Sequence, residues 1–199
     1  NKELAGKTLG IFGLGHIGKA LAQRAVALGV KVQYFDVVRQ SEAEKEWGLK
    51  YLFPEELLSS SDIISYHLPK TSFTHHLINR NSLRKMRPDA LLINSSRGYI
   101  QDENAIIEAL TSGQISAAGL DVFEVEPLPE NSPLRKLENV VLTPHSAPDN
   151  ESLILAVRNA LDNLLRVSNG NEPQSIAVDH EELTRQFLER FPEVKLTAS

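Results

Sequence analysis

The chain has 199 residues, which suits one domain or one domain with an appendage, and 41% of them are hydrophobic, which is enough to bury a core. The 21 Lys and Arg residues against 26 Asp and Glu residues give a net charge of −5, so the composition offers no basic surface for nucleic acid. The absence of cysteine excludes disulfides and thiolate metal sites, and no apolar run approaches the ~20 residues of a membrane span. Because the chain starts at Asn1 and not at a methionine, we expect it to be a piece of a longer protein.

Residues 8–36 form the stretch around which the rest of the chain is organised. An apolar run at 9–12 meets the pattern Gly-Leu-Gly-His-Ile-Gly, a helical stretch follows, and a second apolar run at 30–35 ends in Asp36. This order predicts a strand, a glycine turn, a helix and a second strand closed by an acid. It is typical of a unit that binds a dinucleotide, with an ordinary βαβ turn as the alternative.

Each part of this stretch has a physical role toward a dinucleotide. Gly13 permits the tight turn, Gly15 lets a pyrophosphate approach the backbone, and Gly18 lets the helix pack close to the strand. The N–H groups and the dipole at the helix start attract the phosphates. Asp36 can accept hydrogen bonds from both adenosine ribose hydroxyls, which favours NAD over NADP because a 2′-phosphate would face a carboxylate. Arg39 would weaken that preference unless it is a solvated surface side chain.

The rest of the chain alternates short apolar runs with amphipathic stretches. Further strands are expected at residues 49–52, 62–67, 90–94, 117–121 and 140–142. Further helices are expected at residues 41–47, 55–60, 81–86, 102–112, 150–167 and 181–191. Ser41 and Asp102 are candidate N-caps for two of these helices. Strands alternating with helices predict an α/β fold, a Rossmann-type doubly wound parallel sheet with helices on both faces.

The long helix expected near the C-terminus is followed by Ser-Asn-Gly, which divides the chain. We expect residues 1–168 to form a NAD(P)-binding Rossmann domain and residues 169–199 to form a C-terminal tail with a short amphipathic helix. In that helix Leu183, Phe187 and Phe191 are spaced four residues apart and share an apolar face. Such a face can dock on its own domain, on a further domain or on another subunit.

Polar side chains follow five of the predicted strands. Parallel strands bring their carboxyl ends to one edge of a sheet, and ligands bind outside that edge. The side chains expected to converge there are Asp36, His67, Ser95, Arg97, Asp121 and His145.

Three residues near this edge have the chemistry of an acid–base site. The Arg97 guanidinium can hold a carboxylate through two hydrogen bonds and polarise a neighbouring carbonyl. Glu126 and His145 follow different strands, and a histidine paired with a carboxylate can donate a proton to a carbonyl oxygen or accept one from a hydroxyl. Taken singly, they could instead be a phosphate-binding or surface arginine, a solvated glutamate and a histidine bonded to backbone. The adjacent His75 and His76 fall on different faces of any regular element, so we interpret them as loop residues and assign no metal site.

Several motifs in order resemble the NAD-binding domain of the D-isomer-specific 2-hydroxyacid dehydrogenases. The resemblance runs from residue 4 to about residue 178. It rests on LAGKTLGIFGLGHIG at 4–18, INSSRG at 93–98, GLDVFEVEPLP at 119–129 and LTPHSA at 142–147.

This resemblance implies a NAD-dependent enzyme that interconverts a D-2-hydroxy acid and its 2-oxo acid by hydride transfer. It assigns substrate binding to Arg97, the acid–base role to His145, the supporting carboxylate to Glu126 and the nicotinamide carboxamide to Asp121. The remaining cofactor contacts that it implies are Gly13, Gly15, His16, Ile17, Gly18, Asp36, Leu68, Pro69, Ser95 and Ser146. It also implies a small-molecule substrate, a homodimer and a cytoplasmic location, with no nucleic-acid or membrane partner.

Two departures from the family pattern limit this interpretation. Pro148 stands where the family usually has a small residue, and the N-terminal segment that builds most of the family's substrate domain is absent from the sequence. The identity of the substrate therefore stays open, and phosphite is one alternative. A dinucleotide-sensing module that recruits partners, as the corepressor relatives do, is another.

Overall fold

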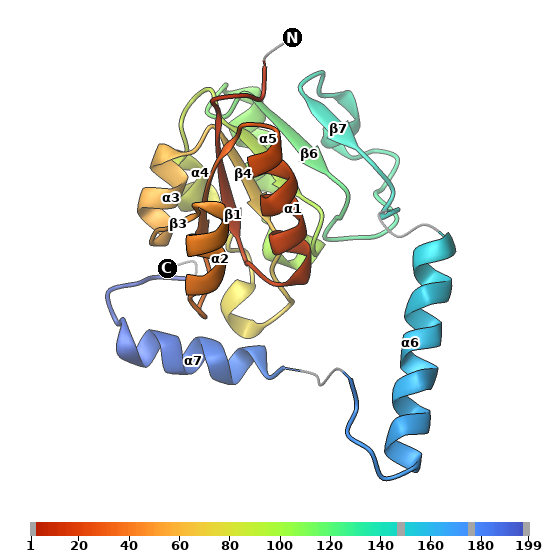
Figure 1. The fold of residues 1–199 in the computed structure, drawn as a ribbon. Coiled ribbons are helices and arrows are strands. Elements are labelled where there is room, and N and C mark those ends of the chain that lie inside the picture. Colours follow the sequence, from red (N-terminus) through yellow and green to blue (C-terminus); the bar gives the residue numbers. More distant parts are fainter. Residues whose placement is uncertain (1–2, 147–149, 175–177, 197–199) are drawn as a thin grey trace.

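A computed structural model describes residues 3–146, 150–174 and 178–196 of the chain. Its centre is a seven-stranded sheet in which every neighbouring pair of strands is parallel (Figure 1). The strands are β1 (Thr8–Phe12), β2 (Lys31–Phe35), β3 (Lys50–Tyr51), β4 (Ile63–Tyr66), β5 (Leu91–Asn94), β6 (Ala117–Leu120) and β7 (Val140–Leu142). Their order across the sheet is β3-β2-β1-β4-β5-β6-β7, so the doubly wound Rossmann topology predicted from the sequence is confirmed.

Helices cover both faces of this sheet (Figure 1). The α-helices are α1 (His16–Ala27), α2 (Ser41–Trp47), α3 (Pro54–Ser60), α4 (Arg80–Lys85), α5 (Glu103–Thr111), α6 (Asn150–Ser168) and α7 (His180–Arg190). Three short 3-10 turns, η1 (Ser72–Thr74), η2 (Gly98–Ile100) and η3 (Pro133–Lys136), lie in the connections. Helices α1 and α2 pack on one face, and α3, α4 and α5 pack on the other, because the chain changes face between β3 and β4.

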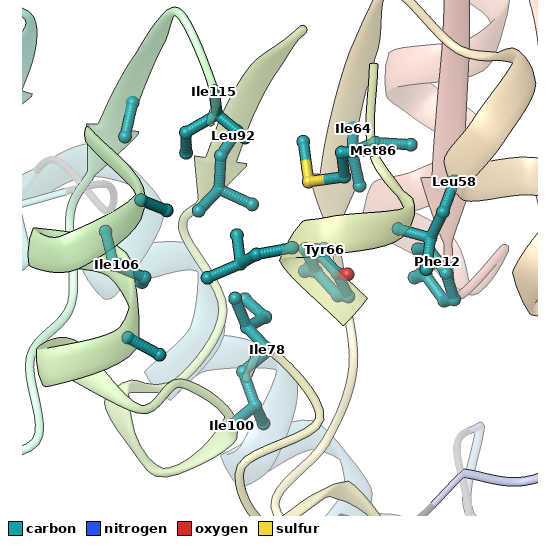
Figure 2. Packing of buried hydrophobic residues seen from close by; sticks show 14 of the residues in the cluster. Phe12, Leu58, Ile64, Tyr66, Ile78, Met86, Leu92, Ile100, Ile106 and Ile115 are labelled. Carbon is teal, nitrogen blue, oxygen red and sulfur yellow. The ribbon is translucent and has the colours of Figure 1, made fainter. Parts of the chain in front are cut away.

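The two faces carry separate apolar clusters, which explains why most strand residues are apolar. Ile11 and Tyr34 belong to the cluster under α1 and α2, and both side chains are fully buried. Phe12 belongs to the cluster on the opposite face and stacks on Tyr66, with ring centroids 4.6 Å apart. Figure 2 shows side chains of this second cluster from Leu58 of α3 to Ile106 of α5. Because side chains on both sides of such a strand are buried, its sequence does not alternate between apolar and polar residues, and β1 is accordingly an apolar run.

The ends of the helices follow local capping chemistry, with one correction. Asp102 caps α5 as predicted, since its carboxylate accepts the N–H of Ala105 at 3.0 Å. The prediction that Ser41 is an N-cap is wrong: α2 already begins at Ser41, and Gln40 occupies the cap position without a side-chain hydrogen bond. The Asp179 side chain accepts the N–H of Glu182 and so starts α7 one residue earlier than predicted.

The two C-terminal helices differ in how they meet the sheet. Helix α6 stands apart from the sheet (Figure 1). Its row of apolar side chains, which includes Ile154, Leu161 and Leu164, is exposed. Helix α7 runs beside the carboxyl ends of β1 and β2, where Phe187 meets Phe35 edge to face at 5.5 Å between ring centroids. The apolar face of α7 therefore docks on this domain. None of the helices in the described part of the chain has the length and apolar character needed to cross a membrane.

Candidate active site

The glycine turn between β1 and α1 has the geometry that the sequence predicts. Gly13 has φ +90°, and a Cβ there would lie 2.4 Å from the carbonyl oxygen of His67. A Cβ on Gly18 would lie 2.1 Å from the carbonyl oxygen of Gly13, which is the close approach of helix to strand. A Cβ on Gly15 would meet nothing within 4 Å. The first and third glycines are thus required by the fold itself, and the side of the middle glycine is free for a ligand.

The start of α1 is suited to an anion. His16 and Ile17 form the first turn, and both are exposed at the mouth of the glycine turn. The first turn holds no acidic residue, and within the described chain no side chain caps it. Its backbone N–H groups and the positive end of the helix dipole are therefore available to a diphosphate.

Asp36 is fixed beside this turn at the end of β2. Its Oδ2 accepts the N–H of Leu14 at 2.7 Å, and its Oδ1 accepts the N–H of Val38 at 2.9 Å. Each carboxylate oxygen keeps a further lone pair for a hydroxyl donor. Arg39 points elsewhere: its guanidinium donates to both carboxylate oxygens of Glu44 at 2.8 Å. This pairing agrees with the interpretation of Arg39 as a surface side chain.

A cavity of about 330 Å³ joins the glycine turn to the loops after β2 and β4. Six of the residues predicted to contact a cofactor or to lie at the sheet edge line it: Gly13, Gly15, Asp36, His67, Leu68 and Pro69. The Nε2 of His67 lies 2.9 Å from the Oγ of Ser65, and burial lowers the pKa of this imidazole. His67 is therefore a neutral wall of the cavity, and His16, Ile17 and Gly18 lie on the helix beside it.

A buried amide network shapes the loop after β5. The Asn94 side chain accepts hydrogen bonds from the backbone N–H and the hydroxyl of Ser96, and it donates to Gln101 at 2.7 Å. A Cβ on Gly98 would lie only 1.7 Å from the carbonyl oxygen of Phe123, so only glycine fits there. Ser95 and Arg97 project from this loop as exposed side chains. The Arg97 guanidinium donates to the carbonyl oxygen of Ser96 at 2.6 Å.

Asp121, at the end of β6, joins the two loops that follow β6 and β7. Its Oδ1 accepts the hydroxyl of Thr143 at 2.5 Å and the N–H of Ser146 at 3.1 Å. Its Oδ2 is buried and has no hydrogen-bond partner among the described residues. A buried carboxylate oxygen without a donor is costly, so this atom fits a ligand that brings an N–H group.

Glu126 and His145 meet at the same edge. The Nδ1–H of His145 donates to Oε2 of Glu126 at 2.8 Å, and the N–H of Phe123 donates to Oε1 at 3.0 Å. These hydrogen bonds, the one from His145 first, lower the pKa of Glu126. His145 has φ +52°, a left-handed conformation that is rare outside glycine and often occurs at functional sites. Both residues border a second cavity of about 580 Å³, which Leu128 and Leu142 also line.

The remaining histidines differ from expectation in their geometry. The rings of His75 and His76 stack, with centroids 4.0 Å apart, although adjacent residues of a regular element face apart. The reason is a turn in which His76 has φ +47°. His76 pairs with Glu124 at 3.0 Å. In the described ranges no group of three or more His, Cys, Asp or Glu side chains could hold a metal ion. Pro148 lies outside the described residues.

Sequence reasoning missed three residues that hold the site in position. Asn94 and Gln101 form the network under the Arg97 loop, and Thr143 binds Asp121. Asn94 is the polar end of an otherwise apolar strand, and this was the available signal. Gln101 gave no such signal, because the complete burial of its side chain depends on packing.

The fold and this edge together define a Rossmann-type dinucleotide-binding domain. Residues 1–147 match the family model of the D-isomer specific 2-hydroxyacid dehydrogenase NAD binding domain. The chain belongs to the D-isomer-specific 2-hydroxyacid dehydrogenase family, and the matched part is its NAD-binding domain.

Named relatives agree with this assignment. The chain is 54% identical over 142 residues to a glyoxylate reductase of Thermococcus litoralis, covering 71% of this chain and 43% of that protein. It is 43% identical over 175 residues to a glyoxylate reductase of Korarchaeum cryptofilum, covering 87% of this chain and 53% of that protein. The crystal structure of D-lactate dehydrogenase with NAD+ from Lactobacillus jensenii superposes with a TM-score of 0.80 at 34% identity, covering 89% of this chain and 57% of that one. The chain thus spans about half the length of the curated relatives it matches.

Proposed function

We propose that this chain is the NAD-binding part of an enzyme that interconverts a D-2-hydroxy acid and its 2-oxo acid. The observation that carries the proposal is the 2.8 Å pair of His145 and Glu126, which lies at the cofactor edge of the sheet in a domain of this family. A positioned histidine with a carboxylate behind it is the usual device for moving a proton to or from a reacting oxygen. Relatives that are named glyoxylate reductases support a small 2-oxo acid as the substrate.

The cofactor half of the edge fits NAD. In the proposal, the first turn of α1, with His16 and Ile17, holds the diphosphate against Gly15, and Asp36 accepts the ribose hydroxyls. Leu68 and Pro69 border the adenosine half. Bound NADH supplies the hydride for reduction of the substrate carbonyl.

The nicotinamide half is held by the loops after β5, β6 and β7. The free Oδ2 of Asp121 accepts an N–H of the carboxamide, while its Oδ1 keeps Thr143 and Ser146 in place. Ser95 lies on the neighbouring loop beside the nicotinamide. These contacts hold the ring in one orientation, which is what hydride transfer to a single face of the substrate requires.

Two side chains act on the substrate itself. Arg97 binds the substrate carboxylate through its guanidinium and polarises the neighbouring carbonyl. His145 donates a proton from its Nε2 to the carbonyl oxygen during reduction and accepts it from the hydroxyl during oxidation. Glu126 receives the Nδ1–H, which fixes the orientation of the ring and favours the charged imidazolium.

The test is turnover by the full-length protein. NADH oxidation should be observed with at least one of glyoxylate, hydroxypyruvate and pyruvate, and NAD reduction with the matching D-hydroxy acid. NADH binding without turnover of any oxo acid would contradict the enzyme and favour a dinucleotide-sensing module. Turnover with phosphite and NAD alone would contradict the proposed substrate class.

We further propose the domain boundaries of this chain, the oligomeric state of the protein and its location in the cell. Residues 1–168 form the NAD-binding domain and 169–199 its C-terminal tail, and two copies pair as a homodimer. The exposed apolar row on α6, with Leu161 near its middle, supports pairing because such a row is usually covered. Sedimentation of the full-length protein at micromolar concentration tests the dimer. Fractionation of cells that express it tests a cytoplasmic location.

A further inference from the structure

The cavity beside the glycine turn has one wall that does not come from the Rossmann sheet and its connections. On one side lie the glycine turn and Asp36. On the other side lie five residues from the C-terminal part of the chain, which we call the tail wall. The tail wall consists of Val178, His180, Leu183, Thr184 and Leu196.

The tail wall is anchored at three points. The carboxylate of Glu181 accepts the backbone N–H of Ser72 at 2.5 Å and its hydroxyl at 2.8 Å, which ties the start of α7 to the η1 turn. Phe187 packs edge to face on Phe35 at the end of β2. Leu196, beyond the helix, is only 7% exposed. Helix α7 is thus held at a fixed distance from the sheet edge with the cavity open between them.

Apart from the imidazole of His180 at the start of α7, the tail wall presents an apolar surface to this cavity. Leu183 contributes an aliphatic side chain, and the hydroxyl of Thr184 is already bonded within the helix to the carbonyl oxygen of His180 at 2.7 Å. Asp36 is the anionic group across the cavity, and its carboxylate can only accept hydrogen bonds. A ligand that satisfies both sides carries hydroxyls toward Asp36 and a flat apolar group toward Leu183. The adenosine half of a dinucleotide has this chemistry, and a cavity of about 330 Å³ is in the range of small-ligand sites.

We propose that the tail wall completes the adenosine pocket, with Leu183 in contact with the purine ring. This inference rests on the proposed function, since it takes the bound dinucleotide as given. It makes the C-terminal segment a determinant of affinity for the adenosine half, with no direct contact to the nicotinamide half. The opposite arrangement, in which the tail competes with the cofactor, predicts tighter binding when the wall is weakened.

The experiment compares two leucines of the same helix in the full-length protein. Leu183→Ala removes a residue that lines the cavity, and Leu188→Ala removes one that packs on the core without lining it. Dissociation constants are measured by fluorescence for NADH and for reduced nicotinamide mononucleotide, which lacks the adenosine half. We expect Leu183→Ala to weaken NADH binding about tenfold and to leave the affinity for the mononucleotide unchanged, since about three carbon atoms of a half-buried side chain are lost. Leu188→Ala should change neither constant.

Two further variants keep the result interpretable. Leu183→Met conserves the volume and should keep the NADH affinity, and Leu183→Val is the milder truncation if the alanine variant does not fold. Unchanged or tighter NADH binding by folded Leu183→Ala or Leu183→Val overturns the proposal. A loss of affinity for the mononucleotide as large as the loss for NADH also overturns it. Wild-type protein that binds neither ligand would overturn the dinucleotide function itself, and the tail-wall proposal with it.

Discussion

The Nδ1 of His145 lies 2.8 Å from Oε2 of Glu126, although the two residues follow different strands. Glu126 is held in turn by the N–H of Phe123, and His145 is held by the left-handed turn at the end of the Thr143–Ser146 loop, which Asp121 anchors at both ends. The pair is therefore fixed by backbone and buried groups on both sides. Among the described residues this arrangement leaves Nε2 of His145 without a partner, so it is available to a substrate.

The first prediction concerns the proton donor. In the full-length enzyme, His145→Ala should lower kcat by about 10²–10⁴-fold, because general acid–base catalysis has this magnitude. NADH affinity should hardly change, since the imidazole is expected to touch the substrate and not the cofactor. Steady-state kinetics and NADH fluorescence titration on the same preparation measure both. A loss of NADH affinity as large as the loss of kcat would contradict the assigned role.

The second prediction separates charge from shape at Glu126. The hydrogen bond from His145 keeps the pKa of Glu126 below its ordinary value of 4.5, so the carboxylate is charged from pH 5 to 9. Glu126→Gln keeps the shape but removes the negative charge that faces the imidazolium during the reaction. The pH–rate profiles of reduction and of oxidation should then both move to lower pH. The loss of kcat at the optimum should be smaller than the loss caused by His145→Ala. Profiles that coincide with those of the wild type would remove Glu126 from the mechanism.

A third prediction tests the close packing under Arg97. Gly98→Ala would place a Cβ 1.7 Å from the carbonyl oxygen of Phe123, so the backbone must move. Overpacking of this kind costs about 1–3 kcal/mol or more of unfolding free energy, and the Arg97 loop should shift with it. Gly119→Ala is the matched control, because a Cβ there meets nothing within 4 Å. Urea unfolding and KM for the oxo acid should change for Gly98→Ala and not for Gly119→Ala.

Asp36 is predicted to set the preference for NADH over NADPH. Its carboxylate lines the cavity beside the glycine turn, and Arg39 is occupied by Glu44. NADH should therefore bind more tightly than NADPH in fluorescence titrations, and Asp36→Ser should narrow the difference by improving NADPH binding. Arg39→Ala should leave the ratio unchanged. Wild-type protein that binds NADPH as well as NADH would contradict this role of Asp36.

A fifth prediction follows from the buried imidazole of His67. Burial lowers its pKa below the ordinary value of 6.5, so between the two values the unfolded chain binds more protons than the folded one. The contribution of His67 to unfolding free energy is thus complete above about pH 6.5 and is lost as the pH falls through the lowered pKa. His67→Gln should show a smaller loss of stability over this window, and His16→Gln, an exposed control, should behave like the wild type. Urea unfolding at closely spaced pH values measures it.

The sequence alone determined what is local in the chain. The glycine turn, the acid that closes β2 and the Asp102 cap each depend on a few neighbouring residues, and each lies where it was predicted. The alternation of apolar runs with amphipathic stretches likewise predicted a doubly wound sheet, because parallel strands need a helix between them. Ser41 was misassigned because a serine at a helix start is compatible with more than one cap position.

Which distant groups meet depends on the tertiary structure. The distance from His145 to Glu126 and the unpaired Oδ2 of Asp121 depend on β6 lying beside β7, and no local pattern records such a register. The sequence left three docking sites open for the apolar face of α7, and packing of Phe187 on Phe35 selected the cofactor edge. The physical reason is that these contacts join segments far apart in the chain, so they exist only once the whole sheet has brought those segments together.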